Sequence, residues 1–235
     1  MLGACKKDKG GDEPETVPTC AMVKTVERWG SSEDIDTDVV KFDEQGRVVK
    51  DGDNTYEYSS GKITVTENYS GGSQYITEYT LDGQGRVITS KYSGTDTEYK
   101  YNNDGYLIER KSGDYTTAYE WQNGNLVKIV STSIYNGTSQ EVYSSTITYG
   151  NDTINDKLIA GVIFGEMYAE WHLSAYFGKQ PKNAPVMEKE KNSGPETTNI
   201  YFYVKDSKNK VIGYTETKDG EISPWWEYTV DYNCK

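Results

Sequence analysis

The chain repeats a short unit in which alternating aromatic residues run into a polar turn that ends in glycine. Residues 98–130 hold two copies, EYKYNNDGYLIERKSGDYTTAYEWQNGNLVKIV, in which Gly105 and Gly124 end the turns. Alternation with a period of two indicates strands, and glycine readily supplies the positive φ that a short hairpin loop requires. Each unit is therefore a β-hairpin with its aromatic rings on one face.

Similar turns recur along the chain. On one rim of the predicted sheet, the further turns are Phe42–Val48, Tyr58–Ile63 and Leu81–Val87. On the other rim, the turns are Ser70–Ser73, Ser93–Thr95, Ser112–Asp114 and Asn136–Thr138. Turn signals roughly every 8–12 residues are typical of an antiparallel up-and-down meander, for which we count about 14 strands.

The composition agrees with an all-β protein. Hydrophobic residues make up only 34% of the chain, but 21 tyrosines and 5 tryptophans can bury apolar rings while their polar ends remain solvated. The formal net charge is −12. Because phosphate binding requires a basic surface, we expect no nucleic-acid partner.

The predicted strands carry polar residues on the face opposite their apolar one. In Lys62–Thr66 that face holds Lys62, Thr64 and Thr66. A transmembrane barrel needs an apolar outer band, and a transmembrane helix needs a run of about 18 or more apolar residues. Neither pattern occurs, so we expect a water-soluble barrel.

We divide the chain into a polar tether at residues 1–19 and a single antiparallel β domain at residues 20–235. The acidic segment Ser31–Asp38 is interpreted as a loop near the start of this domain. The hairpin pattern is interrupted by an insert at about residues 151–199 and resumes from Ile200.

Within the insert, the segment Ile159–Phe177 is rich in apolar and aromatic residues. Ile163, Met167 and Trp171 recur at helical spacing, which predicts one or two short helices. Pro181, Pro185 and Pro195 follow, so residues 179–199 are interpreted as a long ordered loop.

A meander of this size leaves two exposed edges unless it closes, and closure into a barrel removes them. With an even number of strands, the first and last strands meet antiparallel. Cys20 opens the first predicted strand and Cys234 ends the last. A disulfide between them across the seam and two free thiols both remain open.

The N-terminal sequence Leu2-Gly3-Ala4-Cys5 resembles a bacterial lipobox. The resemblance implies that Cys5 is lipidated after cleavage and that residues 6–18 form a tether. The protein would then be attached to the membrane through this lipid anchor alone. The implied location is the bacterial cell envelope, as an outer-membrane lipoprotein on the periplasmic or the surface side.

Two turns, FDEQGRV and LDGQGRV, resemble the YD repeats of Rhs-type proteins. Only these two units keep the full pattern, so the Rhs function is not carried over. The chain from about Cys20 resembles more closely a family of Gram-negative envelope lipoproteins of unknown function with a porin-like fold. The resemblance rests on the lipobox, the aromatic–glycine hairpins and the segment AYFGKQPKNAPVM before the last strands. It implies a soluble antiparallel barrel and supplies no catalytic residues.

Candidate catalytic and metal-binding residues are few. His172 is the only histidine, so a triad containing histidine would have to include it. Its place beside Trp171 favours a packed side chain. The acidic segments 33–38 and 51–54 lack the twelve-residue loop pattern of a calcium site and are interpreted as solvated loops. We therefore expect no catalytic, cofactor or metal residues.

The candidate ligand-stacking residues are Trp225 and Trp226. Successive strand residues point to opposite faces, so one tryptophan faces inward and the other outward. An exposed ring could stack on a sugar or a protein, and packing over the seam is the alternative. We expect a non-catalytic binding module for glycan or protein. A carboxylate-based glycoside hydrolase and a structural spacer are the alternatives.

Overall fold

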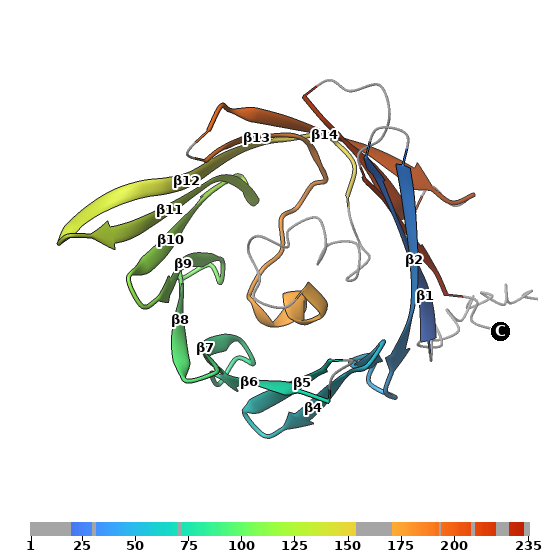
Figure 1. Cartoon of the computed structure of the whole chain (residues 1–235), viewed down its shortest axis with the longest axis horizontal. Coiled ribbons are helices and arrows are strands. Elements are labelled where there is room, and N and C mark those ends of the chain that lie inside the picture. The colour runs from blue at the N-terminus through green and yellow to red at the C-terminus, as the bar shows by residue number, and fades with distance from the viewer. Residues whose placement is uncertain are drawn as a thin grey trace, which may run out of the picture.

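The computed structural model describes residues 20–29, 32–69, 72–153, 171–192, 194–207, 210–219 and 226–232. In this part of the chain, sixteen strands form one closed antiparallel barrel (Figure 1). The strands are β1 (Cys20–Trp29), β2 (Ser32–Phe42), β3 (Val48–Asp51), β4 (Asn54–Ser59), β5 (Lys62–Asn68), β6 (Gln74–Leu81), β7 (Val87–Tyr92), β8 (Thr95–Tyr101), β9 (Leu107–Ser112), β10 (Tyr115–Gln122), β11 (Asn125–Tyr135), β12 (Thr138–Tyr149), β13 (Pro185–Lys191), β14 (Thr197–Lys205), β15 (Val211–Lys218) and β16 (Trp226–Asp231). The predicted all-β barrel is confirmed.

Each strand pairs with its neighbours in sequence, and β1 closes the ring against β16. This seam is antiparallel, with Met22 opposite Asp231 and Glu27 opposite Trp226. The even strand number therefore produces the predicted antiparallel closure, which leaves the sheet without exposed edges.

The turn between β6 and β7 explains the LDGQGRV motif. Asp82 Oδ1 accepts hydrogen bonds from the backbone N–H groups of Gln84 and Arg86, at 2.8 and 2.9 Å. Arg86 Nε also donates to Asp82 Oδ2 at 2.8 Å, and the guanidinium lies 4.5 Å from the ring centroid of Tyr101. The motif therefore fixes its own loop and attaches it to the end of β8.

The same arrangement recurs with different residues in the turn between β8 and β9. Asn102 Oδ1 accepts the backbone N–H of Tyr106 at 3.0 Å. The Tyr106 ring takes the place of the arginine and lies 4.4 Å from the Trp121 ring. Gly105 has a φ of 89°, as the sequence predicts for this loop. An aspartate or asparagine followed four residues later by a stacking side chain is therefore the repeated element.

The structure has sixteen strands where about 14 are expected, and strands occur in two intervals expected to be loops. Within the expected acidic loop Ser31–Asp38, the described residues 32–38 are part of a strand, because Ser32–Phe42 pairs with β1. The interval 179–199 contains β13, which begins at Pro185. Proline is tolerated at the first residue of a strand, so it marks the start of a strand here and does not break one.

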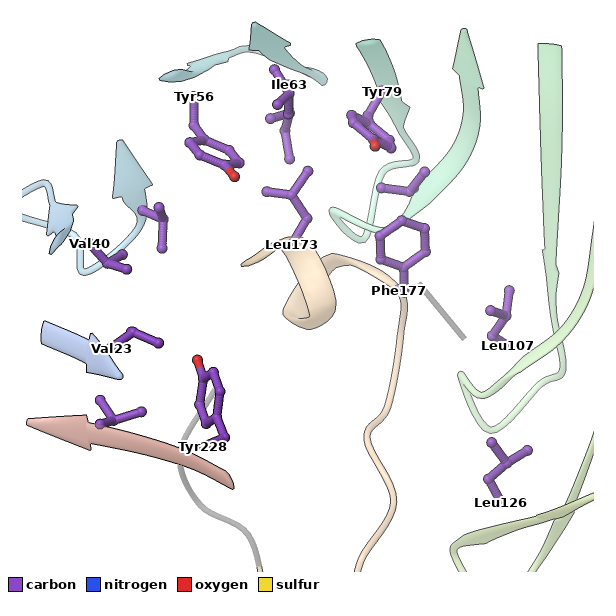
Figure 2. Packing of buried hydrophobic residues seen from close by; sticks show 14 of the residues in the cluster. Val23, Val40, Tyr56, Ile63, Tyr79, Leu107, Leu126, Leu173, Phe177 and Tyr228 are labelled. Carbon is purple, nitrogen blue, oxygen red and sulfur yellow. The ribbon is translucent and has the colours of Figure 1, made fainter. Parts of the chain in front are cut away.

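The insert enters the ring of strands, where the described part forms the 3₁₀-helix η2 (Trp171–Tyr176) (Figure 1). The expected helical segment Ile159–Phe177 is thus present only as η2 in the described residues, and positions 154–170 lie outside them. Figure 2 shows Leu173 pointing toward Tyr56 and Ile63, and Phe177 pointing toward Tyr79. Both insert side chains are 0% exposed. The apolar core therefore forms between the insert and the barrel wall.

Backbone hydrogen bonds fasten the insert to one end of the barrel. The N–H of Lys179 donates to Gly105 at 2.9 Å, and the N–H of Lys182 donates to Gly124 at 2.9 Å. We call this end, with the turns at 43–47, 82–86, 102–106 and 123–124, the insert rim. The end with the turns at 52–53, 72–73, 93–94, 113–114 and 136–137 is called the opposite rim.

Candidate ligand-binding surfaces on the inner wall

Packing against the insert identifies the inner face of each strand. Tyr79 on β6 and Tyr99 on β8 are buried, with ring centroids 6.3 and 5.1 Å from that of Phe177. Residues directly opposite one another on paired strands share a face. The strand registers therefore place the other inward side chains relative to these tyrosines.

A belt of hydroxyl groups follows on the same face toward the opposite rim. Thr77 and Thr97 are buried, and Thr97 donates to Ser112 at 3.1 Å. Thr117 and Ser131 are hydrogen-bonded to each other at 2.9 Å. Because Thr97 pairs with Ser112 and Thr117 with Ser131 across neighbouring strands, these four hydroxyls are satisfied within the belt, which lies between the core and the rim.

Beyond the belt, three tyrosines at the opposite rim form what we call the tyrosine patch: Tyr69, Tyr75 and Tyr92. Tyr75 lies on the same face of β6 as the buried Tyr79, and Tyr92 is opposite Thr77 on that face. The ring centroids of Tyr75 and Tyr92 are 5.8 Å apart and stacked, and Tyr69 meets Tyr75 edge-on at 5.3 Å.

The tyrosine patch is exposed despite facing inward. Its side chains are 52%, 41% and 42% exposed for Tyr69, Tyr75 and Tyr92. A polar group borders the rings, because the Tyr69 hydroxyl donates to Glu67 at 3.0 Å and Glu67 lies opposite Tyr75 on the same face. The patch thus combines flat apolar faces with hydrogen-bonding edges, a combination suited to amphipathic ligands.

A second surface is formed by carboxylates on β13 and β15. Glu188 is 8% exposed, and both its oxygens accept hydrogen bonds, from the Ser145 hydroxyl and from the Tyr201 hydroxyl at 2.9 Å. Glu190 accepts from Tyr143 at 3.3 Å. We call Glu188, Glu190 and Glu216 the glutamate cluster.

Glu216 has a perturbed carboxyl group. It lies opposite Tyr201 on β14 and opposite Trp226 on β16. Burial, followed by the charges of Glu188 and Glu190, raises the pKa of Glu216 to about 7, and Lys218 partly offsets this rise. Its carboxyl group therefore changes charge close to neutral pH.

His172 joins the insert to a group of aspartates on the inner wall. Its Nε2 lies 2.7 Å from Asp51 Oδ2, and its ring meets Tyr56 edge-on at 5.4 Å. Burial, the nearby charge of Asp51 and that of Asp36 raise the pKa of Asp38, whereas His172 lowers it. The histidine packs between the insert and the wall, and Asp51 lies in the wall instead of in a solvated loop.

The residues predicted from the sequence are only partly within the described chain. Trp226 lies on the inner wall, where its ring centroid is 5.8 Å from that of Tyr214. Cys20 is disulfide-bonded to a partner outside the described residues. Cys5, Trp225 and Cys234 also lie outside the described residues.

Sequence reasoning missed both inner-wall surfaces. The glutamate cluster is assembled from β15 and from β13, which lies in the interval that the sequence predicts to be a loop, so no local spacing reveals it. The tyrosine patch has a weak signal, because Tyr69, Tyr75 and Tyr92 all flank turns of the same rim. The sequence alone does not reveal the tyrosine patch, because it does not show which face of the strands is inside the barrel.

Comparisons with known proteins identify the fold. No protein-family profile matches the sequence, and no curated protein matches it. A porin-like protein from Bacteroides uniformis superimposes with a TM-score of 0.64 and 16% identity, over 93% of this chain and 97% of that one. A porin-like protein from Bacteroides vulgatus gives a TM-score of 0.63 and 13% identity, over 90% and 98%.

Among the described residues, no helix has the length and apolar character needed to cross a membrane. The similarity to the two Bacteroides proteins extends over nearly the whole of each chain, and at these identities it concerns the fold alone. The chain therefore has the fold of a porin-like barrel.

Proposed function

We propose that this protein is an envelope-anchored lipoprotein whose barrel binds a neutral glycan chain, without catalysis, at the tyrosine patch. The observation that carries the proposal is the stacked and exposed ring pair Tyr75–Tyr92 on the inner face of the opposite rim. On the same face, the Tyr79 and Tyr99 rings are buried against Phe177 of the insert, whereas the Tyr75 and Tyr92 rings remain 41% and 42% exposed.

The chemistry of the patch favours a sugar. The ring faces can stack against the C–H face of a pyranose, while Glu67 and the tyrosine hydroxyls can hydrogen-bond its hydroxyl groups. The inner face of a barrel rim also suits a slender chain better than the broad surface of a globular protein. A net charge of −12 disfavours sulfated or uronic polysaccharides, so the proposed glycan is uncharged.

Three further parts of this proposal concern location and covalent structure. Lipidation of Cys5 would hold the barrel at the outer membrane. The partner proposed for Cys20 is Cys234, because the seam register brings Met22 opposite Asp231, three residues before Cys234 in the chain. A water-exposed barrel is supported by charged pairs on the outer wall, including Lys100 with Glu109 at 2.6 Å.

The test is affinity electrophoresis of the full chain in gels that contain laminarin, xylan or galactomannan. We expect at least one polysaccharide to retard the wild-type protein. Tyr75→Ala should weaken that binding about five- to thirtyfold, because stacking one aromatic ring contributes roughly 1–2 kcal/mol.

The matched control is Phe202→Ala, which removes a 55% exposed ring from the outer face of β14. It should leave the retardation unchanged. Equal loss of binding in both variants contradicts the proposal. The absence of retardation of the wild type in every gel also contradicts it and favours the role of structural spacer.

The glycoside hydrolase remains the second candidate because of Glu216. A carboxyl group with a pKa of about 7 beside two other carboxyl groups has the property expected of a general acid. Release of reducing sugar by the wild type and its loss in Glu216→Gln would support this alternative. Retardation without release of reducing sugar supports the non-catalytic role.

A further inference from the structure

We propose that the inner wall of β13–β16 holds a binding site for an organic cation, in which the glutamate cluster receives an ammonium group between the rings of Tyr201 and Trp226. This site is formed by other strands than the tyrosine patch, and the inference does not depend on the patch.

The strand register builds the site around Glu216. Tyr201 and Trp226 lie directly opposite Glu216 on its two neighbouring strands, so a ring stands on each side of this carboxyl group. Tyr201 donates a hydrogen bond to Glu188, which joins the carboxyl groups of β13 and β15 through one side chain. Carboxylate and aromatic faces together are the chemistry that recognises alkylammonium groups.

A buried acceptor without a protein donor lies at this place. Asn199 is 7% exposed, and its Oδ1 has no hydrogen-bond partner among the described residues. It lies on the same face as Tyr201, with Glu188 opposite it on β13 and Lys218 opposite it on β15. Because leaving a buried acceptor unpaired is costly, a ligand that brings a hydrogen-bond donor fits this position.

The ligand class follows from what the wall offers. Glu188, Glu190, Glu216 and Asn199 Oδ1 all provide acceptors, and Lys218 offsets only one negative charge. In the described ranges, no group of three or more histidine, cysteine, aspartate or glutamate side chains is placed to hold a metal ion. An organic cation fits better, since it brings N–H donors, positive charge and C–H groups for the flanking rings.

The charge of the site depends on pH because the carboxyl group of Glu216 titrates. On β16, the residue opposite Glu216 is Trp226, which carries no charge. The titratable groups that act on Glu216, or on which it acts, are Glu188 and Glu190 on β13, Tyr201 and Tyr203 on β14, and Tyr214 and Lys218 on β15. Since the carboxyl pKa is about 7, the site gains negative charge between pH 6 and pH 8.

The experiment is isothermal titration of the full chain with spermidine, a flexible organic cation, at pH 8 and pH 6. We expect saturable binding at pH 8, about tenfold weaker at pH 6, where Glu216 is mostly protonated. Glu216→Gln should weaken binding at pH 8 by about tenfold and remove most of the pH dependence.

The matched control is Glu227→Gln, which also removes one negative charge, but from β16 instead of β15. Glu227 is opposite Thr215, so it faces away from Glu216 and its substitution should leave spermidine binding unchanged. Equal weakening by both substitutions would indicate general charge attraction and overturn the proposal.

Wild-type binding that is absent, or that is equal at pH 6 and pH 8, overturns the proposal without any variant. That comparison decides the question even if Glu216→Gln fails to fold, which a circular-dichroism melt will report. Cleavage of a polysaccharide that is lost in Glu216→Gln would instead assign the cluster to the hydrolase alternative. Failure of the tyrosine patch to bind glycan leaves this test unaffected.

Discussion

Phe177→Ala is expected to lower the free energy of unfolding by about 3–5 kcal/mol, the range found when a buried phenylalanine is truncated. Phe177 is 0% exposed and packs edge-on against Tyr79 and Tyr99. Truncation removes this contact and leaves a cavity between the insert and β6–β8. Urea unfolding followed by tryptophan fluorescence measures the change.

The control for this substitution is Phe202→Ala, which removes the same ring from an exposed position. Phe202 is 55% exposed on the outer wall, so its loss should change stability by no more than about 0.5 kcal/mol. If Phe177→Ala were as mild as Phe202→Ala, the insert would not be part of the core.

Gly178→Ala is expected to destabilise the protein by about 3 kcal/mol or more, through two separate effects. Its φ of 86° is unfavourable for any residue with a Cβ, at a cost of roughly 1–2 kcal/mol. In addition, a Cβ at this position would lie 2.5 Å from the Gly105 carbonyl oxygen and 2.9 Å from the Tyr101 ring. The backbone would have to move where the insert meets the turn between β8 and β9.

Gly94→Ala separates the two effects. Gly94 has nearly the same φ, 84°, but a Cβ there would meet nothing within 4 Å. We expect its cost to be the conformational part alone, about 1–2 kcal/mol. Equal losses of stability in thermal or urea unfolding would show that the insert does not approach Gly105 as closely as described.

Hairpin turns were the most predictable part of this structure, because their chemistry is local. Gly105 and Gly124 have φ values of 89° and 84°, as their positions in the repeated unit require. In the loops 43–47, 82–86 and 102–106, the aspartate or asparagine side chain accepts its hydrogen bonds from residues no more than four positions away. A single sequence therefore contains nearly all the information that these turns use.

The strands that were missed depend on distant partners. Ser32–Phe42 is acidic and mostly exposed, so it lacks the apolar alternation that predicts a strand, yet it pairs with β1 over ten residue pairs. For β13, the prolines at 181, 185 and 195 predict a loop, although Pro185 is the first residue of the strand. The pairing of β13 with β12 and β14 supplies the order that local propensity does not.

The candidate sites could not be predicted because they depend on register and on which face is inside. Glu188 and Glu216 come together through Tyr201 on the strand between them, and this requires two correct strand pairings. The acidic composition and the tyrosine content were visible in the sequence. Their arrangement into a glutamate cluster and a tyrosine patch was not.

The inner-wall arrangement gives the barrel two chemically different surfaces. The tyrosine patch offers stacked rings at the opposite rim, whereas the glutamate cluster offers negative charge beside Tyr201 and Trp226. The described part of the insert is attached near the other rim, where the backbone N–H groups of Lys179 and Lys182 bond to the turns. Ligand contact is therefore expected at the end of the barrel away from these bonds.

The most direct test of this account is hydrogen–deuterium exchange of the full chain with and without the polysaccharide that retards it most strongly. We predict slower exchange at the strand ends of the opposite rim, in peptides that contain Tyr75 and Tyr92. Exchange in the insert-rim turns 82–86 and 102–106 should not change. Protection confined to the insert rim or to the outer-wall segment around Phe202, with none at Tyr75 and Tyr92, would contradict the assignment of the binding surface.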